Sequence, residues 1–217
     1  MHPGIRATVF LACLAPLAWL FYSAGTGALG PDPADALMHG SGEWSLRFLA
    51  LTLLATPLKA ITGWTALLRL RRMLGLYAFF YACMHLLAFL QFYTGWGLGR
   101  VLEEVVERPY ITAGFAGLLC MFPLAVTSTR SMQRRLRRNW IRLHRLVYPA
   151  AVLGCLHLLW QARSDLGEAL VYAGVFSVLL GWRLVRVWRT RNASKRSPEV
   201  AVSERKMNSQ NGAAQAS

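Results

Sequence analysis

The chain has 217 residues, of which 55% are hydrophobic, and it contains eight tryptophans. Its mean hydropathy of +0.35 is unusual for a water-soluble domain of this length, so the composition favours a protein embedded in the lipid bilayer. The net charge of +14 could suggest a nucleic-acid partner, but the basic residues cluster at the ends of apolar runs. Anionic lipid headgroups account for such clusters, and we expect no nucleic acid.

Six long apolar runs follow one another along the chain. They cover residues 7–24, 45–63, 74–94, 110–127, 143–160 and 168–187. Runs of about 18 to 21 residues suffice for an α-helix to cross a hydrocarbon core of about 30 Å. Membrane strands would require an alternating pattern, which is absent. The sequence therefore predicts an all-α bundle of about six transmembrane helices within a membrane domain at 1–190.

The first run also resembles a secretory signal, because Arg6 precedes it and Ser23, Ala24 and Gly25 follow it. Its apolar core is long for that role, so we expect a retained helix. The longest predicted loop lies around residues 25–43, and no internal repeat is evident. Residues 191–217 are rich in Ser, Asn, Gln, Ala and charge, which predicts a disordered basic tail.

The charged residues divide between the two sides of the predicted bundle. Four arginines fall on one side together with eight of the ten acidic residues, whereas 20 basic residues share the other side with Glu199 and Glu204 alone. Because positively charged loops remain in the cytosol, both termini are predicted to be cytosolic (N-in, C-in). The protein is then expected to be a multi-pass protein of the bacterial inner membrane.

The four cysteines lie in four different spans, without the paired spacings of a disulfide framework or a zinc site. We expect Cys13, Cys83, Cys120 and Cys155 to be free thiols.

Two histidines lie inside predicted spans at similar depth. His85 lies about 13 residues from Arg72, and His157 about 15 residues from Arg142, in spans that cross in the same direction. A lone membrane histidine can simply hydrogen-bond a neighbouring helix, but ionisable groups in membranes tend to mark function. Two neutral imidazoles facing each other suit a six-coordinate haem iron, and haem b needs no covalent anchor. His2 and His39 are expected to be exposed, outside the spans.

His144 precedes His157 by 13 residues, or about 20 Å along an ideal helix. That spacing could serve a second haem, but the two side chains would point about 140° apart unless Pro149 bends or unwinds the helix. The corresponding position before His85 is Arg72, so a second pair of histidines is missing. Three interpretations of His144 stay open: an iron ligand, a contact to an anionic cofactor or to haem propionates, and a structural residue.

Several ordered motifs surround these histidines. They are Thr56-Pro57-Leu58, the run from Arg71 to Leu76, Pro123-Leu124-Ala125 with Thr127-Ser128, and Asn139-Trp140 through His144-Arg145-Leu146 and Tyr148 to His157. Over roughly residues 5–190 this pattern resembles the haem-binding membrane subunits of the bacterial periplasmic methionine sulfoxide reductase system. That family is related to the ferric reductase transmembrane proteins.

The resemblance implies a subunit that carries haem b and FMN. Such a subunit is expected to take electrons from the quinone pool and to pass them to a periplasmic molybdopterin-containing reductase partner, for repair of oxidised periplasmic proteins. The catalytic centre is then expected on the partner. Because guanidinium groups bind phosphate through paired hydrogen bonds, Arg71, Arg72, Arg145 and Ser128 are candidates for the FMN site, together with His144.

Two other functions use the same histidines. A transmembrane ferric reductase normally carries a cytosolic FAD and NADPH domain, whereas this chain ends about 25 residues after its last predicted span. A haem transporter or chaperone would hold haem that exchanges readily and is not reduced by quinol.

Overall fold

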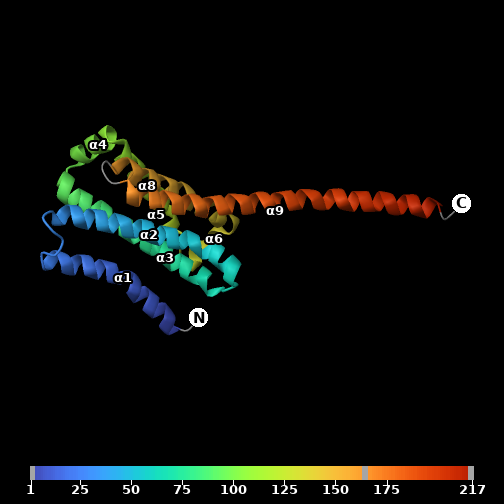
Figure 1. Ribbon diagram of the computed structural model, residues 1–217, viewed down its shortest axis with the longest axis horizontal. Helices are drawn as coiled ribbons and strands as arrows, with labels where there is room; N and C mark the ends of the chain where they lie inside the picture. The colour runs from blue at the N-terminus through green and yellow to red at the C-terminus, as the bar shows by residue number, and fades with distance from the viewer. Residues whose placement is uncertain (1–2, 163–165, 215–217) are drawn as a thin grey trace. The chain divides into compact units, whose positions relative to one another are not determined.

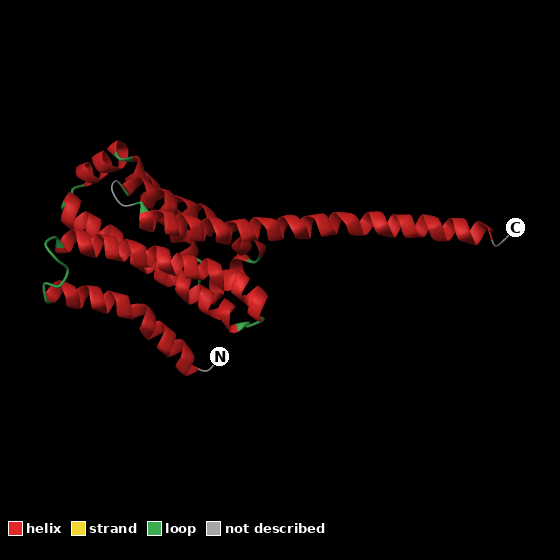
Figure 2. Cartoon of the chain, in the orientation of Figure 1, coloured by secondary structure: helices red, strands yellow, loops and turns green. Residues whose placement is uncertain are grey.

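The computed structural model describes residues 3–162 and 166–214. Within these ranges the chain is helical apart from short connections, and no strand is present (Figures 1 and 2). The helices are α1 (Pro3–Gly25), α2 (Pro33–Thr62), α3 (Ala66–Phe89), the π-helix η1 (Leu90–Thr94), α4 (Leu98–Glu107), α5 (Pro109–Val126), α6 (Arg130–Leu136), α7 (Arg138–Leu143), the 3₁₀ turn η2 (His144–Leu146), α8 (Val147–Gln161) and α9 (Gly167–Ala214). The all-α prediction is confirmed.

Among the described residues, six helical segments are long and apolar enough to cross a membrane. They are Gly4–Gly25, Pro33–Thr62, Ala66–Thr94, Pro109–Val126, Arg138–Gln161 and Gly167–Thr190. Each contains or closely overlaps one of the six predicted spans, so the predicted number of transmembrane helices is confirmed. The direction in which these helices cross the membrane stays a prediction. Three residues used in the sequence analysis, His2, Arg163 and Asp165, lie outside the described residues.

Two segments that were expected to be loops are helical. α2 begins at Pro33, because Asp32 caps it by accepting a hydrogen bond from the Asp35 backbone N–H and because proline suits the first turn. The loop predicted around residues 25–43 is therefore short, and His39 lies in α2. The second segment is α4, a ten-residue helix between two spans. At ten residues it is too short for a span, which is why hydropathy alone overlooks it.

The chain divides into two compact units, Met1–Leu179 and Leu180–Ser217. Within the second unit, the guanidinium of Arg186 lies over the ring of Trp182, 5.2 Å from the ring centroid. α9 continues through residues 191–214, where composition predicts a disordered tail. A helix of this polar composition has no apolar stripe to bury and depends on local propensity alone. The disorder of the tail stays a prediction.

In the first unit the most extensive packing joins α2 to α3 and α5 to α8. α2 buries Phe48 against the rings of Tyr77 and Tyr81 in α3, with centroid distances of 5.6 and 5.3 Å. The hydroxyl of Ser45 donates to the backbone oxygen of Ala78 at 2.9 Å, a bond that replaces water inside the bilayer. These contacts fix the position of α3 along the axis of α2.

Two tyrosines of α3 attach it to α1. Pro16 lies within α1 and loosens its hydrogen-bond ladder. The buried hydroxyl of Tyr81 enters that ladder, donating to the Cys13 oxygen and accepting from the Leu17 N–H, both at 3.0 Å. Tyr77 adds a bond from its hydroxyl to the Phe10 oxygen at 2.9 Å. Both tyrosine hydroxyls therefore provide hydrogen-bond partners for backbone groups of α1, which lipid cannot do.

The helix that carries His144 and His157 is not continuous. The turn from His144 to Leu146 is 3₁₀, and α8 begins at Val147. Pro149 has no N–H to donate to the carbonyl four residues earlier, at Arg145, so the α-helical ladder cannot form there. A tighter 3₁₀ turn therefore interrupts the α-helix between His144 and His157, so the angle expected for an ideal helix does not apply to these two side chains.

Candidate cofactor sites

The imidazoles of His85 in α3 and His157 in α8 face each other. Their ring centroids are 5.9 Å apart and their planes cross at 79°. Two metal–imidazole bonds of about 2 Å each would bring two ring centroids to about 6 Å. The predicted pair is thus at the separation that one shared metal ion requires.

The hydrogen bonds of both rings fix which nitrogen is available. His85 Nδ1 lies 2.8 Å from the backbone oxygen of Met38, and His157 Nδ1 lies 2.6 Å from that of Tyr110. A carbonyl oxygen only accepts, so each Nδ1 carries the proton and each Nε2 has a free lone pair. Ligand histidines are commonly oriented in this way. Both Nε2 atoms are therefore available as metal ligands.

The cavity around this pair, here called the histidine cavity, has a volume of about 480 Å³. It is lined by the first halves of α2 and α5 and the second halves of α3 and α8, including Leu46, Leu86, Phe89, Phe115 and Leu118. Among its Asp, Glu, Lys and Arg lining residues, Asp35, Glu43, Glu104 and Glu168 are acidic and Arg108 is basic. Apolar walls and two opposed imidazoles fit a haem held by ligation and packing. No group of three or more His, Cys, Asp or Glu that could hold another metal occurs among the described residues.

His39 also lines the histidine cavity, contrary to the expectation of an exposed loop residue. Its Nδ1 lies 3.0 Å from the Asp35 backbone oxygen, and the Gln161 side-chain amide donates to its Nε2 at 2.6 Å. The sequence carried a signal for this position: His39 follows Pro33 and the capping residue Asp32 by two turns of helix, which extends α2 past the apolar run.

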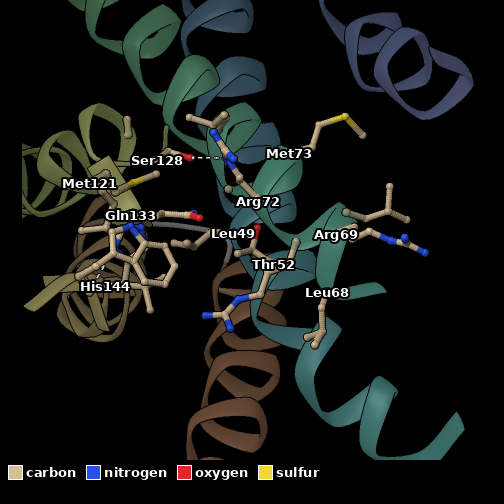
Figure 3. Close-up of a pocket in the computed structure, with 18 of the residues that line it drawn as sticks. Leu49, Thr52, Leu68, Arg69, Arg72, Met73, Met121, Ser128, Gln133 and His144 are labelled. Carbon is tan, nitrogen blue, oxygen red and sulfur yellow. Dashed lines mark hydrogen bonds between the residues drawn. The ribbon is translucent and has the colours of Figure 1, made fainter. Parts of the chain in front are cut away.

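A second cavity of about 1030 Å³, here called the arginine cavity, lies at the other ends of the same four helices. Its lining residues include Arg6, Arg69, Arg71, Arg72, Arg130, Arg145, Ser128, Gln133, His144 and Tyr148. Arg72 Nε donates to the hydroxyl of Ser128 at 3.0 Å, as Figure 3 shows. None of the described lining residues is acidic. The structure therefore brings the five residues predicted for FMN to one anion-attracting cavity.

His144 belongs to the arginine cavity and not to the histidine pair. Its Nδ1 donates to the Trp140 oxygen at 3.1 Å, and its ring stacks on Trp140 with centroids 3.8 Å apart. Trp140 Nε1 in turn donates to the Thr127 oxygen at 3.0 Å. His144 is the one histidine among the described residues lining this cavity. A second pair of facing imidazoles is thus absent from the described residues, as Arg72 indicated.

An internal repeat relates the two halves of the histidine cavity. Met38 and His85 are 47 residues apart, as are Tyr110 and His157. The segments 83–87 and 155–159 share the pattern Cys-x-His-Leu-Leu, so a shift of 72 residues superposes one on the other. The expectation of no internal repeat overlooked this match, because the match covers only a few positions along the chain.

The same shift relates Leu49 to Met121, and these two buried residues line both cavities. They therefore form a thin apolar partition between the two sites.

Comparisons with known proteins show the family of the chain. The family described as "Ferric reductase like transmembrane component" matches residues 41–155. The haem-binding subunit MsrQ of a protein-methionine-sulfoxide reductase from Xanthomonas euvesicatoria pv. vesicatoria is 47% identical over 196 residues, which are 88% of each chain. The subunit of the same name from Rhodospirillum rubrum is 49% identical over 191 residues, covering 88% of this chain and 92% of the relative.

This chain belongs to the MsrQ family. The resemblance predicted from the motifs is confirmed, and with six spans the chain is a multi-pass inner-membrane protein. No solved structure matches it. The four cysteines of this MsrQ-family chain are free, as predicted.

Proposed function

We propose that the chain is a membrane electron-transfer subunit. It takes electrons from the quinone pool and passes them, through FMN and haem b, to a periplasmic molybdopterin-containing methionine sulfoxide reductase. The observation that carries this proposal is the facing pair of His85 and His157, whose Nε2 atoms are both available for one iron. Its relatives bear the name of haem-binding subunits of such reductases.

His85 and His157 would hold haem b, which supplies one-electron chemistry at an iron whose potential depends on its ligands and surroundings. The Met38 and Tyr110 carbonyls hold the two rings in the tautomer that leaves Nε2 free. The apolar walls around them exclude water, which lowers the local dielectric constant and makes the potential sensitive to nearby charges.

The arginine cavity would hold FMN. Arg72 and Ser128 are already joined by a hydrogen bond, which holds the guanidinium in place for a phosphate. Arg71 and Arg145 add positive charge, and the stacked pair of Trp140 and His144 offers a flat surface for a ring system. His144 then serves as a cofactor contact in place of an iron ligand.

The charges of the two cavities support N-in, C-in orientation. Arginines around one cavity would face the cytosol, and the acidic residues around the other would face the periplasm. The partner would dock at this acidic end, where α4 carries Glu103, Glu104 and Glu107. The haem would then lie near the side at which electrons leave.

The test is quinol reduction of the purified protein. We expect quinol to reduce both the flavin and a b-type haem, and the reduced haem to be reoxidised on adding the molybdopterin partner with methionine sulfoxide. A haem that quinol leaves oxidised but that transfers to an apo-globin would indicate a transporter or chaperone. Direct reduction of a ferric chelate without the partner would indicate a ferric reductase.

Cofactor stoichiometry assigns the role of His144. We expect one haem and one FMN per chain in the wild type, with the haem retained in His144→Ala. Two haems that fall to one in this variant would make His144 an iron ligand and would contradict the assignment of the arginine cavity to FMN.

A further inference from the structure

Each histidine of the facing pair lies against a glycine of the neighbouring helix. The His85 ring lies over Gly42 in α2, and the His157 ring lies over Gly114 in α5. Each glycine is one helical turn after the residue whose carbonyl holds that ring, Met38 or Tyr110. The internal repeat thus includes the histidine, the residue whose carbonyl accepts its hydrogen bond, and the glycine that contacts its ring.

The space at these glycines is smaller than a methyl group requires. A Cβ atom at Gly42 would lie 3.0 Å from Nδ1 and 3.2 Å from Cε1 of His85. At Gly114 it would lie 2.9 Å and 3.2 Å from the same atoms of His157. Carbon atoms in packed interiors prefer separations of about 3.5–4.0 Å, so each ring would have to move.

The rings have little freedom to move without losing their function. The clashing edge contains Nδ1, which donates to the backbone carbonyl, and Cε1, which is bonded to Nε2. Displacing this edge lengthens the hydrogen bond and tilts the Nε2 lone pair away from the partner ring. A shift of a few tenths of an ångström therefore acts directly on the atom that binds the metal.

We propose that Gly42 and Gly114 are positioning residues for the two axial ligands, each acting through its own histidine. The proposal rests on the proposed function, because it assumes that His85 and His157 ligate haem. Alanine at either position would weaken one axial bond, convert part of the haem from low spin to high spin and shift the midpoint potential. Alanine at a glycine of these helices that does not contact either ring would not.

Gly117 provides a matched control. It lies one turn after Gly114 in α5, and a Cβ atom there would meet its nearest neighbour, Leu153 Cβ, at 3.5 Å, an ordinary contact. We expect Gly117→Ala to keep the wild-type electron paramagnetic resonance spectrum and midpoint potential. Gly42→Ala and Gly114→Ala should each show a reduced low-spin signal and a shifted potential, measured on purified holoprotein.

A double variant separates positioning from a general folding defect. In His85→Ala the ring that clashes is gone, so adding Gly42→Ala should cause no further loss of folded protein. Free imidazole should enter the vacated space and restore low-spin haem in His85→Ala, and should do so at least tenfold less well in His85→Ala/Gly42→Ala. A folding defect of Gly42→Ala that disappears in the double variant would also support the clash.

Three results would overturn the inference. They are wild-type spectra and potentials in both glycine variants, equal rescue by imidazole with and without Gly42→Ala, and a Gly42→Ala folding defect that persists after His85 is removed. All assume a wild-type protein that contains haem. A wild type without haem would instead overturn the proposed function, so the two failures are distinguishable.

Discussion

The histidine cavity and the arginine cavity share four lining helices, α2, α3, α5 and α8, but offer different chemistry. At one end the repeat is complete, and both α3 and α8 present a histidine. At the other end the corresponding positions are occupied by Arg72 and His144, so the symmetry is broken where charge is needed. The comparison teaches that helices related by one spacing of 72 residues can present matching imidazoles at one end and unlike, basic side chains at the other.

The largest effect that separates the cavities is expected at Arg72. Arg72→Ala removes a charge-assisted hydrogen-bond donor worth about 1.5–3 kcal/mol. The Kd for FMN should therefore rise about 10- to 150-fold, whereas the haem spectrum should be unchanged. Fluorescence titration with FMN measures the first quantity and absorption the second. Arg134→Ala is the control, because Arg134 is basic and on the same side but does not line the cavity. Equal losses of FMN affinity in Arg72→Ala and Arg134→Ala would show that general positive charge, and not a specific contact of Arg72, attracts FMN.

A smaller effect is expected from loosening α1, which contributes Arg6 and Phe10 to the arginine cavity alone. Tyr81→Phe leaves the Cys13 carbonyl and the Leu17 N–H without their partner, at a cost of about 1–3 kcal/mol. We expect a lower thermal unfolding temperature and weaker FMN binding with the haem signal retained. Loss of haem in this variant would show that the cavities are not independent.

The smallest effect is expected at the acidic end. Attraction between exposed charges is screened beyond a Debye length of about 8 Å at physiological ionic strength. Glu103→Gln/Glu107→Gln should slow association with the periplasmic partner a few-fold at low salt and leave the rate unchanged at high salt, as stopped-flow mixing would measure. Slower association at every salt concentration would argue for a role other than electrostatic attraction.

The sequence allowed prediction of much of this architecture. The six spans follow from apolar runs, because length and hydropathy decide whether a helix can cross lipid. His85 and His157 could be paired by depth alone, since both spans cross in the same direction. The free cysteines followed from the absence of paired spacings.

Other features depend on contacts that no local pattern carries. The roles of Gly42 and Gly114 depend on rings that come from helices 43 residues further along the chain. Tyr81 reaches α1 because Pro16 loosens that helix. Each of these results depends on where two distant segments meet.

The central claim is that His85 and His157 together hold one haem iron. The most direct measurement is the reduced-minus-oxidised absorption spectrum, with haem content per chain, of the wild type, His85→Ala, His157→Ala and the double variant. We expect a low-spin b-type signal in the wild type, its loss in both single variants and no haem in the double variant. A colourless wild type, or six-coordinate haem retained after both histidines are removed, would contradict the account.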